Sequence, residues 1–178
     1  MKTQPTIGIS GCLTGSAVRF DGGHKRMGFV MDELAQWVTF SPVCPEMAMG
    51  LPVPRPALRL VQTASGETRM RFSQAPNEDV TQKIDDFTTA YLPRVAELAG
   101  FIVCAKSPSC GMERVRLYDE KGGRGRKEGW GVSPARYSRR TRGCRWKKTV
   151  ACTTRYCAKT LWSAYSHYMS SIPCGHAV

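Results

Sequence analysis

The stretch Phe101–Met112, FIVCAKSPSCGM, constrains the fold of this chain more than any other. A short apolar run, residues 101–105, is typical of a buried strand, and it ends in the turn-rich sequence KSPSCG. Pro108 fixes φ and removes a backbone donor, while Gly111 permits a positive φ, so the pattern predicts a sharp turn. A thiol at Cys110, just past a strand, is expected in the crevice where α/β proteins hold ligands.

Two further cysteines have the same setting, because Cys12 and Cys44 each follow a short apolar run. The carboxyl ends of parallel strands meet at one edge of a sheet, so these thiols and Cys110 are expected to converge there. Three such thiols suit zinc with one more ligand or water, and they also suit a four-iron cluster with one iron free. The alternative is that they are buried small hydrophobic side chains, which fits Cys104 because it lies inside the expected strand.

Strand and helix patterns alternate through residue 105, which predicts an α/β fold. The expected architecture is a Rossmann-like, three-layer parallel sheet with helices on both faces, plus a β-hairpin and a largely irregular C-terminal tail. The expected sheet strands are residues 6–10, 38–43 and 101–105; the helices are 27–37 and one from an N-cap at Asn77 to Gly100; the hairpin pairs 58–62 with 68–72. Residues 113–119 add a final strand, and KGGRGRKEG is expected to be a mobile basic linker.

The positive charge of the chain is concentrated at its C-terminal end. Residues 1–128 hold 17 Lys and Arg and all 14 Asp and Glu, a net charge of +3, whereas residues 129–178 hold 9 Lys and Arg and no acid. Fifty residues without a carboxylate are unusual beside a front part of ordinary composition. The sequence therefore predicts a front domain, 1–128, and a basic tail, 129–178, that is disordered, with a short helix at most over 158–169.

The eight cysteines bear on the cellular compartment. No apolar run approaches the roughly 20 residues of a membrane span, and the N-terminus MKTQPTIGIS lacks the apolar core of a signal peptide. We expect a cytoplasmic protein without a membrane partner. In that reducing compartment, many cysteines favour metal binding or catalysis over disulfides.

Several polar residues lie close to the three cysteines in sequence. Glu46, two residues past Cys44, suits general acid–base chemistry beside a metal, or else caps a short helix begun by CPEMAMG. Ser107 and Ser109 either donate hydrogen bonds to a ligand or satisfy the backbone of the turn. Three residues of one turn-rich segment can orient a polar substrate, or else form a solvated loop: Arg19, Asp21 and Lys25.

Four motifs carry a resemblance to a known family: ISGCLTG, RFDGGHK, VCPEMAMGLPVPRPALRL and KSPSCGMERVRLYD. Together they resemble the thiouracil desulfidase family over residues 6–129. The resemblance implies a 4Fe–4S cluster on three cysteines, an acid at Glu46 and a serine at Ser107 near the substrate. Some short members have a cysteine where this chain has Val18, so a fourth ligand is excluded there. The implied cluster ligands are Cys12, Cys44 and Cys110.

The activity implied by this resemblance is a hydrolytic, non-redox desulfuration of a thiolated pyrimidine. A free iron acts as a Lewis acid on the exocyclic sulfur, which makes the ring carbon electrophilic. Water deprotonated by Glu46 attacks that carbon, and sulfide departs. The competing hypothesis is a non-catalytic iron–sulfur or zinc module.

The front part also resembles longer two-domain relatives, in which a second domain follows the KEG linker and the implied substrate is 4-thiouridine in transfer RNA. Residues 133–149, SPARYSRRTRGCRWKKT, are compatible with codons that read FTRALFAPYPWLPVEED in another frame, as those relatives have. The favoured hypothesis is therefore loss of the second domain by frameshift. The alternative is a genuine basic extension in which Trp146 and Trp162 stack on RNA bases.

Overall fold

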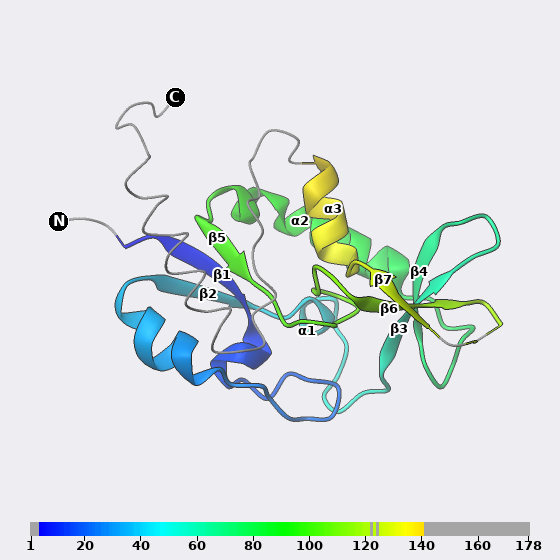
Figure 1. The fold of residues 1–178 in the computed structure, drawn as a ribbon, viewed down its shortest axis with the longest axis horizontal. Helices are drawn as coiled ribbons and strands as arrows, with labels where there is room; N and C mark the ends of the chain where they lie inside the picture. Colours follow the sequence, from blue (N-terminus) through cyan, green and yellow to red (C-terminus); the bar gives the residue numbers. More distant parts are fainter. Residues whose placement is uncertain (1–3, 122, 124, 141–178) are drawn as a thin grey trace.

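A three-stranded parallel sheet lies at the centre of the computed structural model, which describes residues 4–121, 123 and 125–140 (Figure 1). Its strand order is β2-β1-β5, and both neighbours of β1 run parallel to it. The three carboxyl ends therefore meet at one edge, as the sequence predicts. The bounds are Thr6–Ser10 for β1, Thr39–Val43 for β2 and Gly100–Ile102 for β5.

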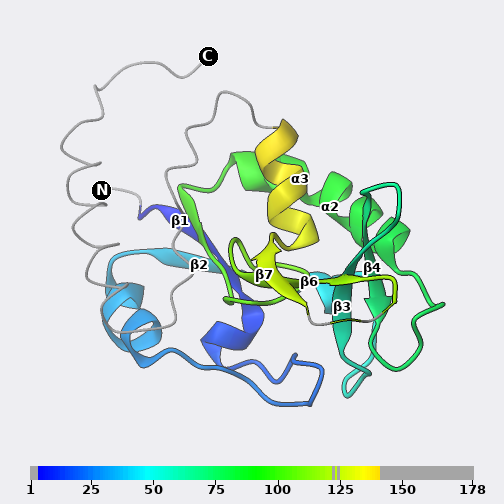
Figure 2. The same ribbon diagram turned by 45° about the vertical axis from the view of Figure 1, so that its right-hand side comes forward.

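Helical segments cover both faces of this sheet, which confirms the expected layered α/β architecture (Figure 2). Ile7 and Ile9 pack with Val30 and Leu34 on one face, whereas Phe101 packs on the other face against α2, residues Thr81–Ala96. Side chains alternate between faces along a strand, so each strand contributes to both layers.

The helix expected over residues 27–37 is shorter and less regular. The structure has a π-helical turn at Phe29–Glu33 followed by a 3₁₀ turn at Leu34–Gln36. Trp37, the last residue of the supposed apolar face, is 58% exposed, so only about one turn of that face reaches the core. Without a longer buried face, packing does not enforce a regular α-helix.

A second, four-stranded sheet adjoins the first, with strand order β4-β3-β6-β7. Its β3–β4 hairpin has the predicted bounds and β6 is the predicted final strand, but β7 falls in the segment expected to be a mobile linker. As an edge strand it pairs through its backbone with β6, which does not require an apolar pattern. The bounds are Leu58–Gln62 for β3, Thr68–Phe72 for β4, Val115–Asp119 for β6 and Arg126–Gly129 for β7.

The long helix α2 begins later than expected, since its N-cap is Val80 and not Asn77. Asp79 forms a bridge with Arg71, which keeps the preceding residues extended, and its carboxylate accepts the Thr81 backbone N–H at 2.8 Å. The helix therefore starts after this contact. A short helix, α1, spans Pro45–Ala48 where CPEMAMG suggested one.

The helix α3, Val132–Arg140, lies against α2 and was not predicted from the sequence (Figure 1). Val132 joins the core under the second sheet, and Tyr137 joins the core between α2 and the first sheet. The Thr88 and Ser133 hydroxyls form a buried hydrogen bond of 3.1 Å between the two helices. The ordered fold thus extends beyond residue 128.

The start of α3 also holds the turn that carries Cys110. A Cβ added to Gly111 would lie 2.7 Å from the Ser107 carbonyl oxygen, and one added to Gly131 would lie 2.8 Å from the Gly111 nitrogen. Gly111 is therefore required for close packing and not for the positive φ expected of it, which occurs instead at Lys106, with φ 63°. Three backbone bonds join the segments: Gly131 N to Gly111 O at 2.6 Å, Val132 N to Pro108 O at 3.1 Å and Ser133 N to Ser109 O at 3.1 Å.

The remaining expectations for the tail, the short helix over 158–169 and the stacking residues Trp146 and Trp162, lie outside the described residues. The frameshift hypothesis stays a prediction, which the reading frame of the gene tests. Over the described part of the chain, helices of the length and apolar character that a bilayer requires are not found.

We predict that truncation after Gly129 destabilises the protein, compared with truncation after Arg140. The shorter chain loses α3, including the buried side chains of Val132 and Tyr137, which contribute about 4 kcal/mol together. Thermal unfolding should then occur at a temperature roughly 10 °C lower. Equal melting temperatures for the two truncated proteins would contradict the role assigned to α3.

Candidate active site

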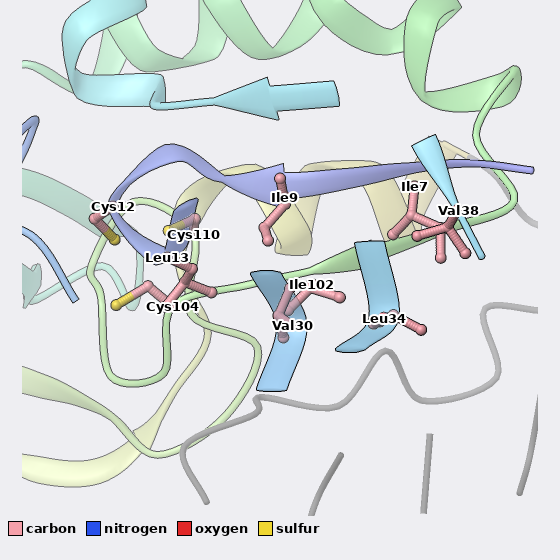
Figure 3. Packing of buried hydrophobic residues seen from close by; sticks show 10 residues of the cluster. All are labelled: Ile7, Ile9, Cys12, Leu13, Val30, Leu34, Val38, Ile102, Cys104 and Cys110. Carbon is pink, nitrogen blue, oxygen red and sulfur yellow. The ribbon is translucent and has the colours of Figure 1, made fainter. Parts of the chain in front are cut away.

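Loops at the carboxyl edge of the first sheet bring cysteines together. Figure 3 shows Cys12, Cys104 and Cys110 at the same end of the core, past the end of β1. Cys44 directly follows β2 at that edge and is the N-cap residue of α1. All four are free thiols in the described part of the chain. The structure therefore brings the three predicted cysteines together and adds Cys104.

The sequence placed Cys104 inside a strand, but β5 ends two residues earlier, at Ile102. Its thiol forms a hydrogen bond with that of Cys12, and this contact raises the pKa of Cys12, as does burial. The same bond, together with the positive charges of Lys25 and Arg19, lowers the pKa of Cys104 to about 7. Cys104 thus belongs to the polar site as well as to the core.

Cys110 is held by a buried serine that the sequence did not single out. The Ser10 hydroxyl donates to the Cys110 sulfur at 3.3 Å and accepts from the Cys104 backbone N–H at 3.0 Å. Burial raises the pKa of Cys110 to about 11. Burial also raises the pKa of Cys44, whose thiol donates to the Val18 carbonyl at 3.8 Å.

Glu46 takes part in a buried ion pair rather than in a helix cap. The Arg55 guanidinium approaches one oxygen of its carboxylate, Oε2, with Nε at 2.8 Å and Nη2 at 2.7 Å. The Arg55 side chain is 2% exposed and that of Glu46 is 11% exposed. A negative and a positive charge thus stand together, out of water, directly beside Cys44.

A chain of hydroxyls links Glu46 to the turn that carries Cys110. Ser109 donates to the Glu46 Oε1 at 2.7 Å and lies 3.0 Å from the Ser107 hydroxyl. A serine has one proton to donate, and that of Ser109 is committed to Glu46, so the Ser107 hydroxyl donates to Ser109. Ser107 in turn accepts from the Cys110 backbone N–H at 3.4 Å. Ser109 is therefore occupied within the protein, whereas Ser107 is less buried.

The three residues of the turn-rich segment make different contacts: Arg19, Asp21 and Lys25. Arg19 and Asp21 form an ion pair at 3.2 Å, and Asp21 also accepts the Gly23 backbone N–H, so the carboxylate orders its own loop. Lys25 is anchored by its backbone N–H, which donates to the Cys12 carbonyl at 2.8 Å. The effect of Arg19 and Lys25 on the pKa of Cys104 places their charges near the thiols.

The thiols of the site are the donor type that iron–sulfur clusters use. In residues 4–121, 123 and 125–140, no three His, Cys, Asp or Glu side chains are arranged to hold one ion. Yet the thiols are close enough that charge on Cys110 or Cys44 acts on the pKa of Cys12. A four-iron cluster takes one thiolate per iron, so its ligands surround a volume and do not converge on one point. The residues present fit such a cluster.

Fold and site together define an α/β protein with a buried, thiol-lined site at the carboxyl edge of a parallel sheet, beside an acid held by arginine. The sequence matches the 2-thiouracil desulfurase family over residues 7–145, and the chain belongs to this family of enzymes. A solved structure of a 4Fe–4S-dependent thiouracil desulfidase, TudS, matches with a TM-score of 0.58 and 27% identity, covering 77% of this chain and 87% of that one. The comparison with curated proteins finds no match.

Two residues of the site were not predicted from the sequence: Arg55 and Ser10. Arg55 lies in the proline-rich run LPVPRPALRL, and nothing within that run indicates that its partner is Glu46. An arginine framed by prolines nine residues after an acid is the signal that was present. Ser10 ends a strand, and nothing in its sequence neighbourhood connects it with Cys110, a hundred residues away.

We predict that the metal-free protein loses stability as the pH rises from about 9 to 11. An unfolded chain releases the Cys110 proton near pH 9, whereas the folded chain keeps it until about pH 11, so the folded state is penalised in that window. Cys110 contributes about 2 to 3 kcal/mol to this loss. Urea unfolding under reducing conditions at each pH measures it. The decline should be smaller in Cys110→Ala, and an equal decline in both proteins would contradict the buried-thiol explanation.

Proposed function

We propose that this chain removes sulfur from a thiolated pyrimidine by hydrolysis, with a 4Fe–4S cluster as cofactor. The observation that carries the proposal is the convergence of Cys12, Cys44 and Cys110 beside Glu46, in a member of the 2-thiouracil desulfurase family. The matching structure is that of a 4Fe–4S-dependent thiouracil desulfidase, which supports the same cofactor for this chain. Atoms balance without a redox partner: the carbon–sulfur double bond and water become a carbon–oxygen double bond and hydrogen sulfide.

The cluster would be held by the thiolates of Cys12, Cys44 and Cys110. The cluster, when bound, would supply a Lewis acid that polarises the carbon–sulfur bond of the substrate. The raised pKa of each of the three thiols means that they are protonated near neutral pH, so loading the cluster releases protons.

The protein groups beside the cluster have separate roles in the proposal. Glu46 takes the proton of the attacking water and returns a proton to the product, since its carboxylate is fixed at the edge of the thiol site. Ser107 positions the pyrimidine ring of the substrate or its exocyclic sulfur. The charges of Arg19 and Lys25 attract electron-rich substrate atoms, whereas Asp21 and Ser109 act within the protein.

The substrate proposed is a free thiolated base or a nucleoside, either thiouracil or thiouridine. Residues 1–128 carry a net charge of only +3, and holding transfer RNA requires a concentrated basic surface to neutralise several phosphates. An RNA-directed activity on 4-thiouridine is the alternative, with the basic residues after 128 as the contact surface. Tight, salt-sensitive binding of transfer RNA would favour that alternative. A reducing cytoplasm suits a protein that depends on free thiols.

We predict that Cys12→Ser, Cys44→Ser and Cys110→Ser each abolish cluster loading, because each removes a proposed ligand. Cys104→Ser should keep the cluster, although its thiol contacts that of Cys12. Iron and sulfide content and the visible absorption after anaerobic reconstitution measure the outcome. A colourless wild-type protein with one zinc per chain would overturn the cluster proposal.

We predict that Glu46→Gln keeps the cluster and lowers sulfide release by at least about 100-fold, since general acid–base catalysis contributes that much. Sulfide release from 2-thiouracil, 4-thiouracil and 4-thiouridine, each with the reconstituted protein, measures the effect. Glu67→Gln is the matched control, because Glu67 forms an exposed ion pair with Arg69 in the second sheet. Unchanged turnover in Glu46→Gln would remove this residue from the mechanism.

A further inference from the structure

We propose that Arg55 is a positioning residue for the desulfuration reaction, and that it acts with Ser109 by clamping the two oxygens of the Glu46 carboxylate. The inference rests on the proposed function, because the reaction needs Glu46 aimed at the attacking water. Neither residue would touch the substrate or the cluster. Both act through Glu46.

The clamp is visible in the contacts of the carboxylate. Oε2 is bound by Arg55 through Nε and Nη2, at 2.8 and 2.7 Å, and Oε1 accepts from Ser109 at 2.7 Å. Rotation of the carboxylate out of its plane breaks contacts on both sides at once. A carboxylate oxygen accepts about two hydrogen bonds, so Oε1 keeps one position for a proton from water or substrate. The clamp therefore leaves Glu46 able to act while it fixes where Glu46 acts.

Backbone carbonyls anchor the Arg55 guanidinium, so its position is fixed independently of the Glu46 carboxylate. Its Nη1 donates to Pro52 O at 3.1 Å and its Nη2 donates to Val18 O at 2.9 Å, while its backbone N–H donates to Phe20 O at 2.9 Å. The planar fork of a guanidinium can serve an acid and two carbonyls in fixed directions, which a lysine ammonium cannot do on its flexible stem.

The anchors of the clamp come from the segments that carry the proposed cluster ligands. The Val18 carbonyl that accepts from Arg55 lies 3.8 Å from the Cys44 sulfur. Ser109 precedes Cys110, and its carbonyl is held by the Ser133 backbone N–H of α3. Glu46 is thus fixed relative to the thiols on both sides, which is the geometry that a reaction at the thiol site requires.

The test uses Arg55→Gln, Arg55→Lys and Ser109→Ala in the reconstituted enzyme. Arg55→Gln should lower kcat about 100-fold and Ser109→Ala about 10-fold, with KM changed less than about twofold, because misplacing a reacting group by an ångström costs that order. Arg55→Lys should retain more kcat than Arg55→Gln, since it keeps the charge but loses the fork. Iron content and visible absorption should equal those of the wild type. Arg71→Gln and Thr88→Val, which remove an arginine pair and a buried hydroxyl away from the site, should leave kcat unchanged.

A double variant separates positioning from a structural role. If Arg55 acts through Glu46, then adding Arg55→Gln to Glu46→Gln lowers kcat no further, whereas independent effects multiply. Three results would each overturn the proposal. The kcat effects of Arg55→Gln and Glu46→Gln could multiply in the double variant, kcat could be unchanged in Arg55→Gln and Ser109→Ala, or all three clamp variants could lose iron. Loaded wild-type protein that releases no sulfide from any thiopyrimidine would overturn the proposed function as well, so the two failures are distinguishable.

Discussion

The buried ion pair between Glu46 and Arg55 is the interaction on which the arrangement of the site depends. Removing two charges from water is costly, and attraction offsets that cost only when geometry is good and the remaining hydrogen-bonding groups are satisfied. Here the guanidinium also serves the Val18 and Pro52 carbonyls, and Ser109 serves the other carboxylate oxygen. Three segments far apart in sequence are therefore tied to one charge pair. The Glu46–Arg55 ion pair therefore helps to position the loops that carry the cysteines.

On the side of the Cys110 turn, the site depends on close packing between backbone segments. A Cβ on Gly111 would clash with the Ser107 backbone inside the turn, and a Cβ on Gly131 would clash with the Gly111 backbone. The close approach of Gly131 lets the start of α3 donate to the carbonyls of the turn. The start of α3 thus supports the loop through backbone hydrogen bonds, while Ser10 at the end of β1 donates to the Cys110 sulfur. A site whose thiols come from loops is made rigid by contacts that contribute no chemistry of their own.

Local patterns were sufficient for some parts of the fold and not for others. The hairpin and the parallel strands were predictable because alternation and turn residues are encoded within a few positions. β7 was missed because an edge strand of Arg, Lys and Glu is stabilised by backbone pairing with β6, which no side-chain pattern records. α3 was missed because its stability comes from contacts with α2. The three loop cysteines were predictable from strand ends, whereas Arg55 and Ser10 act through partners that only the fold brings near.

The fourth thiol shows how the site treats protonation. Cys12 and Cys104 share a hydrogen bond that raises the pKa of one and lowers that of the other, so the pair favours one proton between two sulfurs. Arg19 and Lys25 favour the thiolate on Cys104 rather than on Cys12. A cluster held by Cys12 would replace the proton of this thiol, so the hydrogen bond from Cys12 to Cys104 would be absent in the loaded protein.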